Sequence, residues 1–311
     1  MRASTFAPLP AGARVPPLWA QPLVAVGLFL VPLVPTLLLS GLVLSLLDAQ
    51  GRPAQALFGD WRAALAIMVT YAALLVAGVL LWTRLAERRP LATLGLCGRV
   101  GGREAAWLAA GLVWSAAVTL LFGLIPGGET GPDLSHLSPA ALAWLPLFAA
   151  MLLLLAFMEE LVCRGWMLSS IAARAGAVAG MVLSGLVFAA LHVLPWELTE
   201  PAKLLSFGGY AAMGAGLCAL ALHAGQLWTP TAFHLGYNAV FAALFLAQPN
   251  ASPEQLWRML ESEPRGLTEL PEAAAWLAAN AALAGVFVTL WHRKAARGQS
   301  NRGRPSGETV S

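Results

Sequence analysis

The sequence predicts an all-α, polytopic membrane protein with about eight transmembrane helices and an active site inside the membrane. Of its 311 residues, 58% are hydrophobic and only 11% are charged, and the mean hydropathy is +0.69. These values do not suit a soluble domain, and the apolar segments are long enough to cross a bilayer repeatedly. Several ionisable residues nevertheless lie inside these segments. Charge is costly there, so such residues usually have a function or a tight partner.

The apolar segments divide the chain into spans. The first, residues 23–47, is longer than a signal-peptide core of about 7–15 residues, so we predict a retained helix bent at Pro32 and Pro35. The transmembrane domain is predicted over residues 23–292, with its motif-bearing core at 140–247. Further spans are expected at residues 63–82, 104–125, 140–169, 177–194, 204–222, 226–247 and 273–291. Residues 1–22 and the basic tail 293–311 are predicted to be disordered.

Basic residues predict the orientation, because short cytoplasmic loops carry an excess of Lys and Arg. The loop at 126–139 has neither residue, whereas two other segments concentrate them. With eight spans, both basic segments lie on the same side as the N-terminus. We therefore expect both termini in the cytoplasm, with the protein in a bacterial inner membrane. The basic residues are Arg84, Arg88, Arg89, Arg99 and Arg103 in one segment, and Arg293, Lys294, Arg297, Arg302 and Arg304 in the other.

Charge and cysteine content exclude other classes. The net charge of +3 is too small to indicate a nucleic-acid partner. The three cysteines are an odd number and lack C-x-x-C spacing, so they indicate neither a disulfide framework nor a thiolate metal site. The partners expected from composition are the lipid bilayer and molecules that meet it.

Two adjacent carboxylates follow the apolar run 140–157. Glu160 and Arg164 stand four residues apart, in the acid-before-base order that favours an ion pair on one helix face. Glu159 points about 100° away around the helix, on the face of Cys163, and has no cation nearby in the sequence. We therefore expect a structural Glu160–Arg164 pair and a Glu159 carboxylate that is free for chemistry. A purely structural ion cluster is the alternative.

Polar residues recur at helical spacing in two later spans. Phe188 and His192 stand at i, i+4 in the fifth span, and His234 and Asn238 do so in the seventh. Polar faces must avoid lipid, and they do so best against one another. If the fourth and fifth spans form a hairpin, Glu159 and His192 both lie roughly 20 Å from its turn at 1.5 Å per residue. We therefore expect these faces to share one site.

A free carboxylate, two imidazoles and a carboxamide suit hydrolysis of an amide bond. Glu159, aided by His192, could hold and deprotonate a water, while His234 and Asn238 could donate hydrogen bonds to the oxyanion. This scheme needs no cofactor. Alternatively, Glu159, His192 and His234 form a His₂Glu set for a divalent metal such as zinc, although the sequence lacks H-E-x-x-H. Cys163 as nucleophile has less support, because no activating neighbour is evident.

The ordered motifs resemble those of the CAAX protease and bacteriocin-processing (CPBP) family. They are Glu159-Glu160-x-x-x-Arg164, Phe188-x-x-x-His192 and His234-x-x-x-Asn238, each on a separate span. Members of this family are eight-span intramembrane endopeptidases, and they include the type II CAAX prenyl endopeptidases. The resemblance covers residues 159–238 and implies that Glu159 and His192 activate water while His234 and Asn238 form the oxyanion site. Cys163 departs from the family pattern, in which an aromatic residue commonly precedes the arginine.

The resemblance leaves the substrate open. We expect a peptide or protein substrate at the membrane, prenylated or not. Two other functional classes compete with an enzyme. One is a non-catalytic membrane immunity or adaptor protein that keeps the polar cluster for packing, and the other is a transporter that uses it as a proton or cation site. The presence of all four residues, Glu159, His192, His234 and Asn238, favours the enzyme, because packing alone would not require the full set.

Overall fold

The computed structural model describes residues 9–47, 61–96, 98, 100–125, 142–246 and 269–302, and within these ranges every regular element is helical. The short elements are the 3-10 turns η1 (Leu18–Ala20), η3 (Leu91–Leu94) and η6 (Pro195–Thr199) and the π-helical segments η2 (Trp82–Ala86) and η5 (Leu161–Leu168). The α-helices are α1 (Gln21–Leu30), α2 (Leu33–Leu47), α4 (Trp61–Leu81), α5 (Gly102–Gly123), α7 (Leu145–Glu160), α8 (Ser169–Ala175), α9 (Ala177–Ala190), α10 (Pro201–Ala224), α11 (Trp228–Leu246) and α13 (Leu270–Arg302).

Six helical segments in the described part of the chain are long and apolar enough to cross a membrane. The 14 residues of α9 form a shorter apolar helix, and α11 adds a further helix of 19 residues. Together they agree with the prediction of an all-α, polytopic membrane protein with about eight spans. Lipid is the natural solvent for their outer surfaces, which expose large apolar side chains such as Leu38, Val113 and Leu120.

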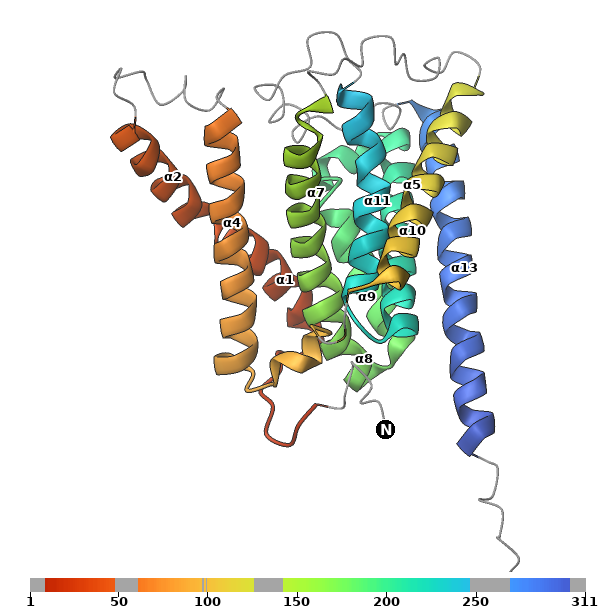
Figure 1. Ribbon diagram of the computed structural model, residues 1–311. Coiled ribbons are helices and arrows are strands. Elements are labelled where there is room, and N and C mark those ends of the chain that lie inside the picture. The colour runs from red at the N-terminus through yellow and green to blue at the C-terminus, as the bar shows by residue number, and fades with distance from the viewer. Residues whose placement is uncertain are drawn as a thin grey trace, which may run out of the picture.

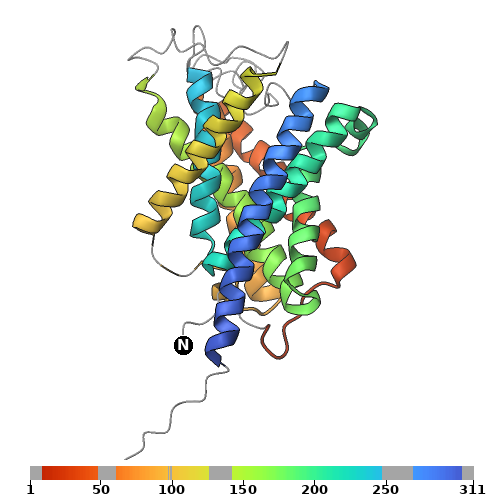
Figure 2. The same cartoon turned by 90° about the vertical axis from the view of Figure 1, so that its right-hand side faces the viewer.

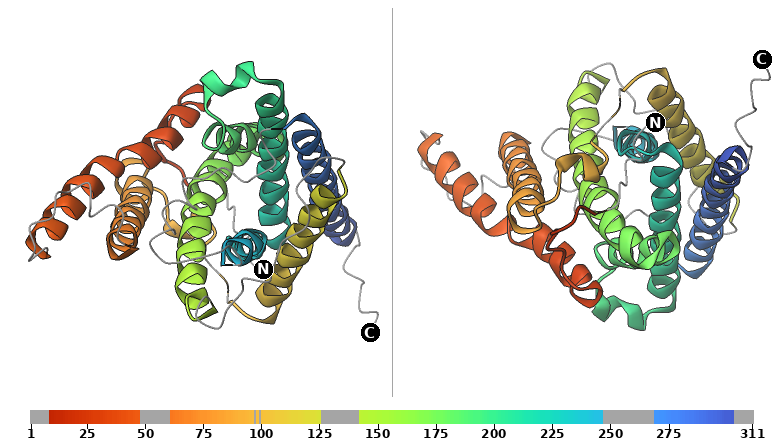
Figure 3. Two further views of the ribbon diagram at one scale, coloured as in Figure 1. Left: turned by 90° about the horizontal axis from the view of Figure 1, so that it is seen from above. Right: turned by 90° about the horizontal axis from the view of Figure 1, so that it is seen from below.

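The helices are arranged around α11. Viewed from above, α11 lies between α7, α10 and α5, while α1, α2 and α4 stand to one side of this group (Figure 3). The helix α13 runs the height of the molecule with α10 packed beside it (Figure 2). Contacts of α11 with both α5 and α7 place the predicted His234 helix next to the glutamate helix.

One end of the molecule gathers the start of α1, the connection from α4 to α5, the turn between α8 and α9, and the end of α13 (Figure 1). The two segments rich in basic residues therefore lie at the same end, as their positions in the sequence predicted. Within the segments predicted to be disordered, the backbone N–H of Arg14 donates to the carbonyl of Glu87, and α13 continues to Arg302. Residues 1–8 and 303–311 of the predicted disordered termini lie outside the described residues.

The predicted bend in the first span is present. The α-helix α1 ends at Leu30 and α2 begins at Leu33, because Pro32 has no N–H to continue the ladder of backbone hydrogen bonds. At this break the hydroxyl of Tyr71 on α4 donates to the carbonyl of Phe29 over 2.9 Å. A side chain of the second span thus satisfies a backbone group that the bend leaves free.

Glycines allow the site-bearing helices to approach one another closely. A Cβ atom on Gly214 of α10 would lie 2.8 Å from the Cα of Gly185 on α9. A Cβ atom on Gly111 of α5 or on Gly236 of α11 would collide with backbone of the facing helix. Small residues let membrane helices pack closely in this way.

Two differences from the predicted span boundaries bear on the site. The helix α7 begins at Leu145 rather than at residue 140. The helix α9 ends at Ala190 rather than at residue 194, because Leu194 precedes Pro195 and takes the extended conformation that a following proline favours. His192 consequently lies just beyond the end of α9, in a turn rather than in the helix.

Candidate active site

The helix that carries the two glutamates runs through them without a break, as expected, but its middle is not α-helical. After α7 ends at Glu160, residues 161–168 form the π-helix η5, and α8 follows directly. All eight residues of η5 are buried. Wide turns of this kind occur mostly at functional sites, since they are less favourable than the α-helix. The sequence pattern gave no signal for the change.

The predicted ion pair between Glu160 and Arg164 is present. Arg164 Nη1 lies 3.0 Å from Glu160 Oε1, and both side chains are 0% exposed. Arg164 has two further partners: its Nη2 donates to the carbonyl of Gly214 over 3.2 Å, and its guanidinium lies 4.4 Å from the ring centroid of Phe188. The arginine therefore links the glutamate helix to both α9 and α10. A buried charge requires partners of this kind.

His234 lies between the two carboxylates. Its Nδ1 is 3.0 Å from Glu160 Oε1, and its Nε2 is 3.7 Å from Glu159 Oε2. Because an ionised carboxylate only accepts hydrogen bonds, Nδ1 carries a proton and donates to Glu160. The expected division between a structural and a catalytic glutamate is thus incomplete. Glu160 neutralises Arg164 and also orients an imidazole of the site, and His234 is the partner that Glu159 lacks on its own helix.

His192 is held by the end of α9. Its Nδ1 lies 2.8 Å from the carbonyl oxygen of Phe188, one of the carbonyls that a helix end leaves without a backbone donor. A carbonyl can only accept, so Nδ1 carries the proton, and in the neutral ring Nε2 is left as an acceptor. The ring stacks on Tyr210 with centroids 4.4 Å apart and an interplanar angle of 23°, and it contacts Phe188 on α9. His192 lies within electrostatic range of Glu159 and His234.

Asn238 lies one turn beyond His234 on α11 and is half-buried. The structure therefore brings Glu159, His192 and His234 together from α7, the end of α9 and α11, while the same helix that carries His234 presents Asn238 next to it. Glu159 retains 13% of its side-chain exposure. The Glu159 side chain is thus partly exposed, although its Oε2 atom is buried, whereas the Glu160 side chain is fully buried.

The alternative metal-binding set is Glu159, His192 and His234. Among the described residues, no three His, Cys, Asp or Glu side chains are grouped so that they could hold a metal ion. A metal requirement therefore stays a prediction. Cys163, the alternative nucleophile, is fully buried, and its carbonyl accepts a hydrogen bond from Ser184 over 2.8 Å.

Some site residues have no signal in the sequence. Tyr210 supplies the surface on which His192 stacks, yet it sits in a glycine-rich stretch that reads as helix packing. The carbonyl of Gly214 binds Arg164, and a backbone acceptor carries no side-chain pattern. Phe188 is part of the predicted motif, but its contacts with Arg164, His192 and His234 depend on how three helices pack.

Comparison with known proteins agrees with the geometry. Residues 141–240 match the family model described as type II CAAX prenyl endopeptidase Rce1-like. No curated protein and no solved structure gives a match. The matched range runs from α7 into α11 and includes every predicted site residue. The resemblance drawn from the motifs is thereby confirmed: residues 141–240 of this integral membrane protein match an Rce1-like model, which is consistent with the CPBP family.

Proposed function

We propose that the protein is an intramembrane endopeptidase that hydrolyses a peptide bond with water activated by Glu159 and His192. One observation carries this proposal. The partly exposed side chain of Glu159 lies beside an imidazole that a second, fully buried carboxylate holds in place. A packing cluster would need the Glu160–Arg164 pair but not a further carboxylate and two oriented imidazoles. The expected substrate is a peptide or protein at the membrane.

In the first step, Glu159 and His192 position one water. The lone pair of His192 Nε2 accepts a hydrogen bond from the water, and the Glu159 carboxylate takes the proton as the water oxygen attacks the carbonyl carbon. The carbonyl π-bond breaks and its electron pair moves to oxygen, which gives a tetrahedral oxyanion. When the C–N bond breaks, the proton held by Glu159 passes to the leaving amine, so the carboxylate is regenerated.

The oxyanion is stabilised by His234 and Asn238. Asn238 Nδ2 donates in any protonation state of the site. His234 Nδ1 already donates to Glu160, so the ring donates to the oxyanion only through Nε2, and it must then carry both protons. Fixed hydrogen-bond donors that point at the charge developing in the transition state contribute strongly to catalysis in a site that excludes water. The Glu160 carboxylate accepts the hydrogen bond from Nδ1 in this state as well.

Glu159→Gln tests the proposal directly. The substitution keeps the size of the side chain and its capacity for hydrogen bonds but removes the base, so cleavage of a membrane peptide substrate should be abolished while expression and thermal melting stay near wild type. Glu272→Gln makes the same chemical change at a buried glutamate of α13 outside the site, and it should retain activity. A Glu159→Gln protein that still cleaves would return the cluster to a packing role.

Chelation tests the metal-free form of this mechanism. Because the carboxylate itself takes the proton, the purified protein should retain its activity after exhaustive treatment with a chelator. Loss of activity with chelation, and its return with added zinc, would contradict the metal-free scheme and assign Glu159, His192 and His234 as ligands.

A further inference from the structure

The connection between α4 and α5 contains a second buried ion pair, outside the site described above. Glu87 Oε2 lies 2.9 Å from Arg89 Nη1, and both side chains are 0% exposed. Burial lowers the pKa of the Arg89 guanidinium, while the neighbouring Glu87 carboxylate acts in the opposite direction. Arg88 between them has a φ of 55°, in the left-handed region that non-glycine residues rarely adopt. The strained backbone turns both neighbours towards the interior, so the surrounding contacts must hold it.

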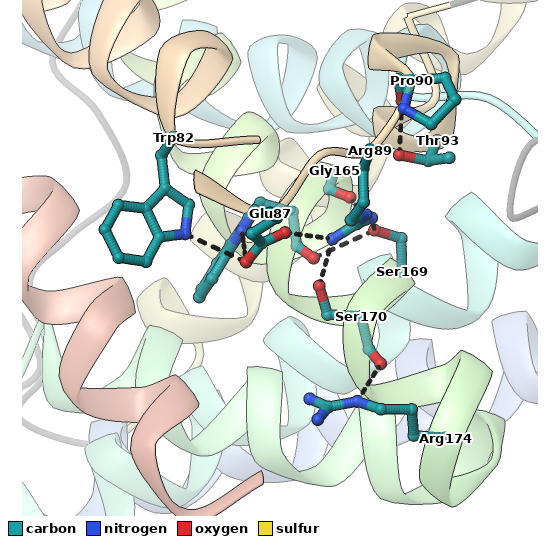
Figure 4. Close-up of polar contacts among 10 residues, drawn as sticks. Trp82, Glu87, Arg89, Pro90, Thr93, Gly165, Ser169, Ser170 and Arg174 are labelled. Atoms are coloured by element: carbon teal, nitrogen blue, oxygen red, sulfur yellow. Dashed lines mark hydrogen bonds and ion pairs between the residues drawn. The ribbon is translucent and has the colours of Figure 1, made fainter. Parts of the chain in front are cut away.

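Those contacts join the connection to the π-helix η5 and to α8. Trp166 Nε1, from η5, donates to Glu87 Oε1 over 2.9 Å. Arg89 donates through Nη2 to Ser169 Oγ over 2.6 Å and through Nη1 to the hydroxyl of Ser170 (Figure 4). The Ser169 hydroxyl in turn donates to the carbonyl of Gly165 over 2.6 Å. Each of these bonds ends on η5, which contains Arg164, or on one of the two serines that directly follow η5.

Backbone contacts of the same connection reach the other half of the site. A Cβ atom on Gly165 would lie 3.0 Å from the carbonyl oxygen of Leu94, so only glycine fits comfortably where η5 meets the connection. The next carbonyl, that of Gly95, accepts a hydrogen bond from the N–H of Leu227 over 2.9 Å. Leu227 directly precedes α11, and His234 lies about two turns along that helix. One short segment therefore contacts both helices whose side chains meet at His234.

We propose that Glu87 and Arg89 are positioning residues for the reaction, which fix the π-helical turn and so the placement of Glu160 and Arg164 against His234. The inference rests on the proposed function. If η5 relaxed towards the ordinary α-helix, its side chains would rotate relative to α7, and Arg164, still paired with Glu160, would move away from Gly214 and Phe188. Glu87 holds η5 through the indole of Trp166, and Arg89 holds it through the hydroxyls of Ser169 and Ser170. Neither Glu87 nor Arg89 contacts the reacting atoms.

Two tryptophans provide a matched test. Trp166 Nε1 and Trp82 Nε1 both donate to Glu87 Oε1, over 2.9 Å and 3.0 Å. Trp82 belongs to η2 on the connection side, so its bond does not reach η5. Replacing either residue with phenylalanine removes one indole donor from the same oxygen. Trp166→Phe should lower kcat on the order of 10–100-fold with little change in KM, as expected when catalytic groups are misplaced by a fraction of an ångström to an ångström.

Trp82→Phe should leave kcat at the wild-type value. It should lower thermal melting less than Trp166→Phe does, because Trp82 is only half-buried whereas Trp166 is fully buried. A purely structural role for the pair would lower melting in both variants and kcat in neither. Equal losses of kcat in the two variants, or no loss in Trp166→Phe, would overturn the positioning role.

A readout without substrate separates this proposal from the proposed function. In protein labelled with ¹⁵N in its histidine rings, the His234 signals are assigned by their loss in His234→Gln. They should shift in Trp166→Phe and in Arg89→Lys, which keeps the charge but not the forked bonds to the two serines, and stay unchanged in Trp82→Phe. If they shift while the wild type cleaves no membrane peptide, the proposed function fails and the positioning stands. If the wild type cleaves but neither kcat nor these signals respond to Trp166→Phe, the positioning fails alone.

Discussion

Removal of Arg164 should destabilise the protein strongly. The pair with Glu160 is fully buried at a separation of 3.0 Å, where two unit charges attract by about 5–6 kcal/mol, before desolvation, at an effective dielectric constant of 20. Arg164→Ala leaves the Glu160 carboxylate desolvated and without its cation, a change that costs about 3–5 kcal/mol for buried pairs. The bond to the Gly214 carbonyl and the contact with Phe188 disappear as well, so we expect the upper part of that range.

The assay is unfolding of the purified protein in mixed detergent micelles, with the free energies of Arg164→Ala, Glu160→Gln and the double variant compared. Each single change leaves one buried polar group without its partner. The double variant should therefore lose less free energy of unfolding than the sum of the two single losses. Arg174→Ala is the control, since Arg174 on α8 is exposed and its loss should change stability by less than about 0.5 kcal/mol. Unfolding of Arg164→Ala at the wild-type midpoint would refute the structural role of the pair.

Two further predictions concern the oxyanion site and the orientation. Asn238→Ala should lower kcat on the order of 10²–10³-fold, as loss of one oxyanion donor does, with normal melting; wild-type kcat would remove Asn238 from the mechanism. Reporter fusions after Arg89 and after Arg302 should report the cytoplasm, whereas a fusion after Ile125, at the opposite end of α5, should report the outer side. A cytoplasmic signal after Ile125 would reverse the predicted topology.

The sequence predicted the parts of the site that depend on spacing along one helix. Glu160 and Arg164 are four residues apart, and both an α-helix and a π-helix keep such residues on one face. Their ion pair could therefore be predicted without knowledge of the neighbouring helices. The bend at Pro32 followed in the same way from the missing N–H of proline. The convergence of Glu159, His192 and His234 was predicted because polar helix faces avoid lipid best by packing against one another.

Details that depend on packing between helices could not be predicted. Glu160 was expected only to neutralise Arg164, but α11 lies close enough to α7 for His234 to reach both glutamates. His192 was placed inside a helix, whereas the early end of α9 puts it in a turn and makes the Phe188 carbonyl available to its Nδ1. Arg89 was treated as one of several loop charges that orient the protein, yet it is buried with Glu87 beneath η5.

The amino-acid sequence by itself determined the class of this protein and the residues of its candidate site, because hydropathy, helical spacing and the cost of charge in lipid act locally along each span. The tertiary structure alone decided which atoms of those residues face one another. The width of the turn at residues 161–168, the protonated nitrogen of His192 and the sharing of His234 between two carboxylates all follow from contacts between segments distant in sequence. Such contacts depend on how closely the helix backbones approach one another, and the residue pattern within a single span does not predict that approach.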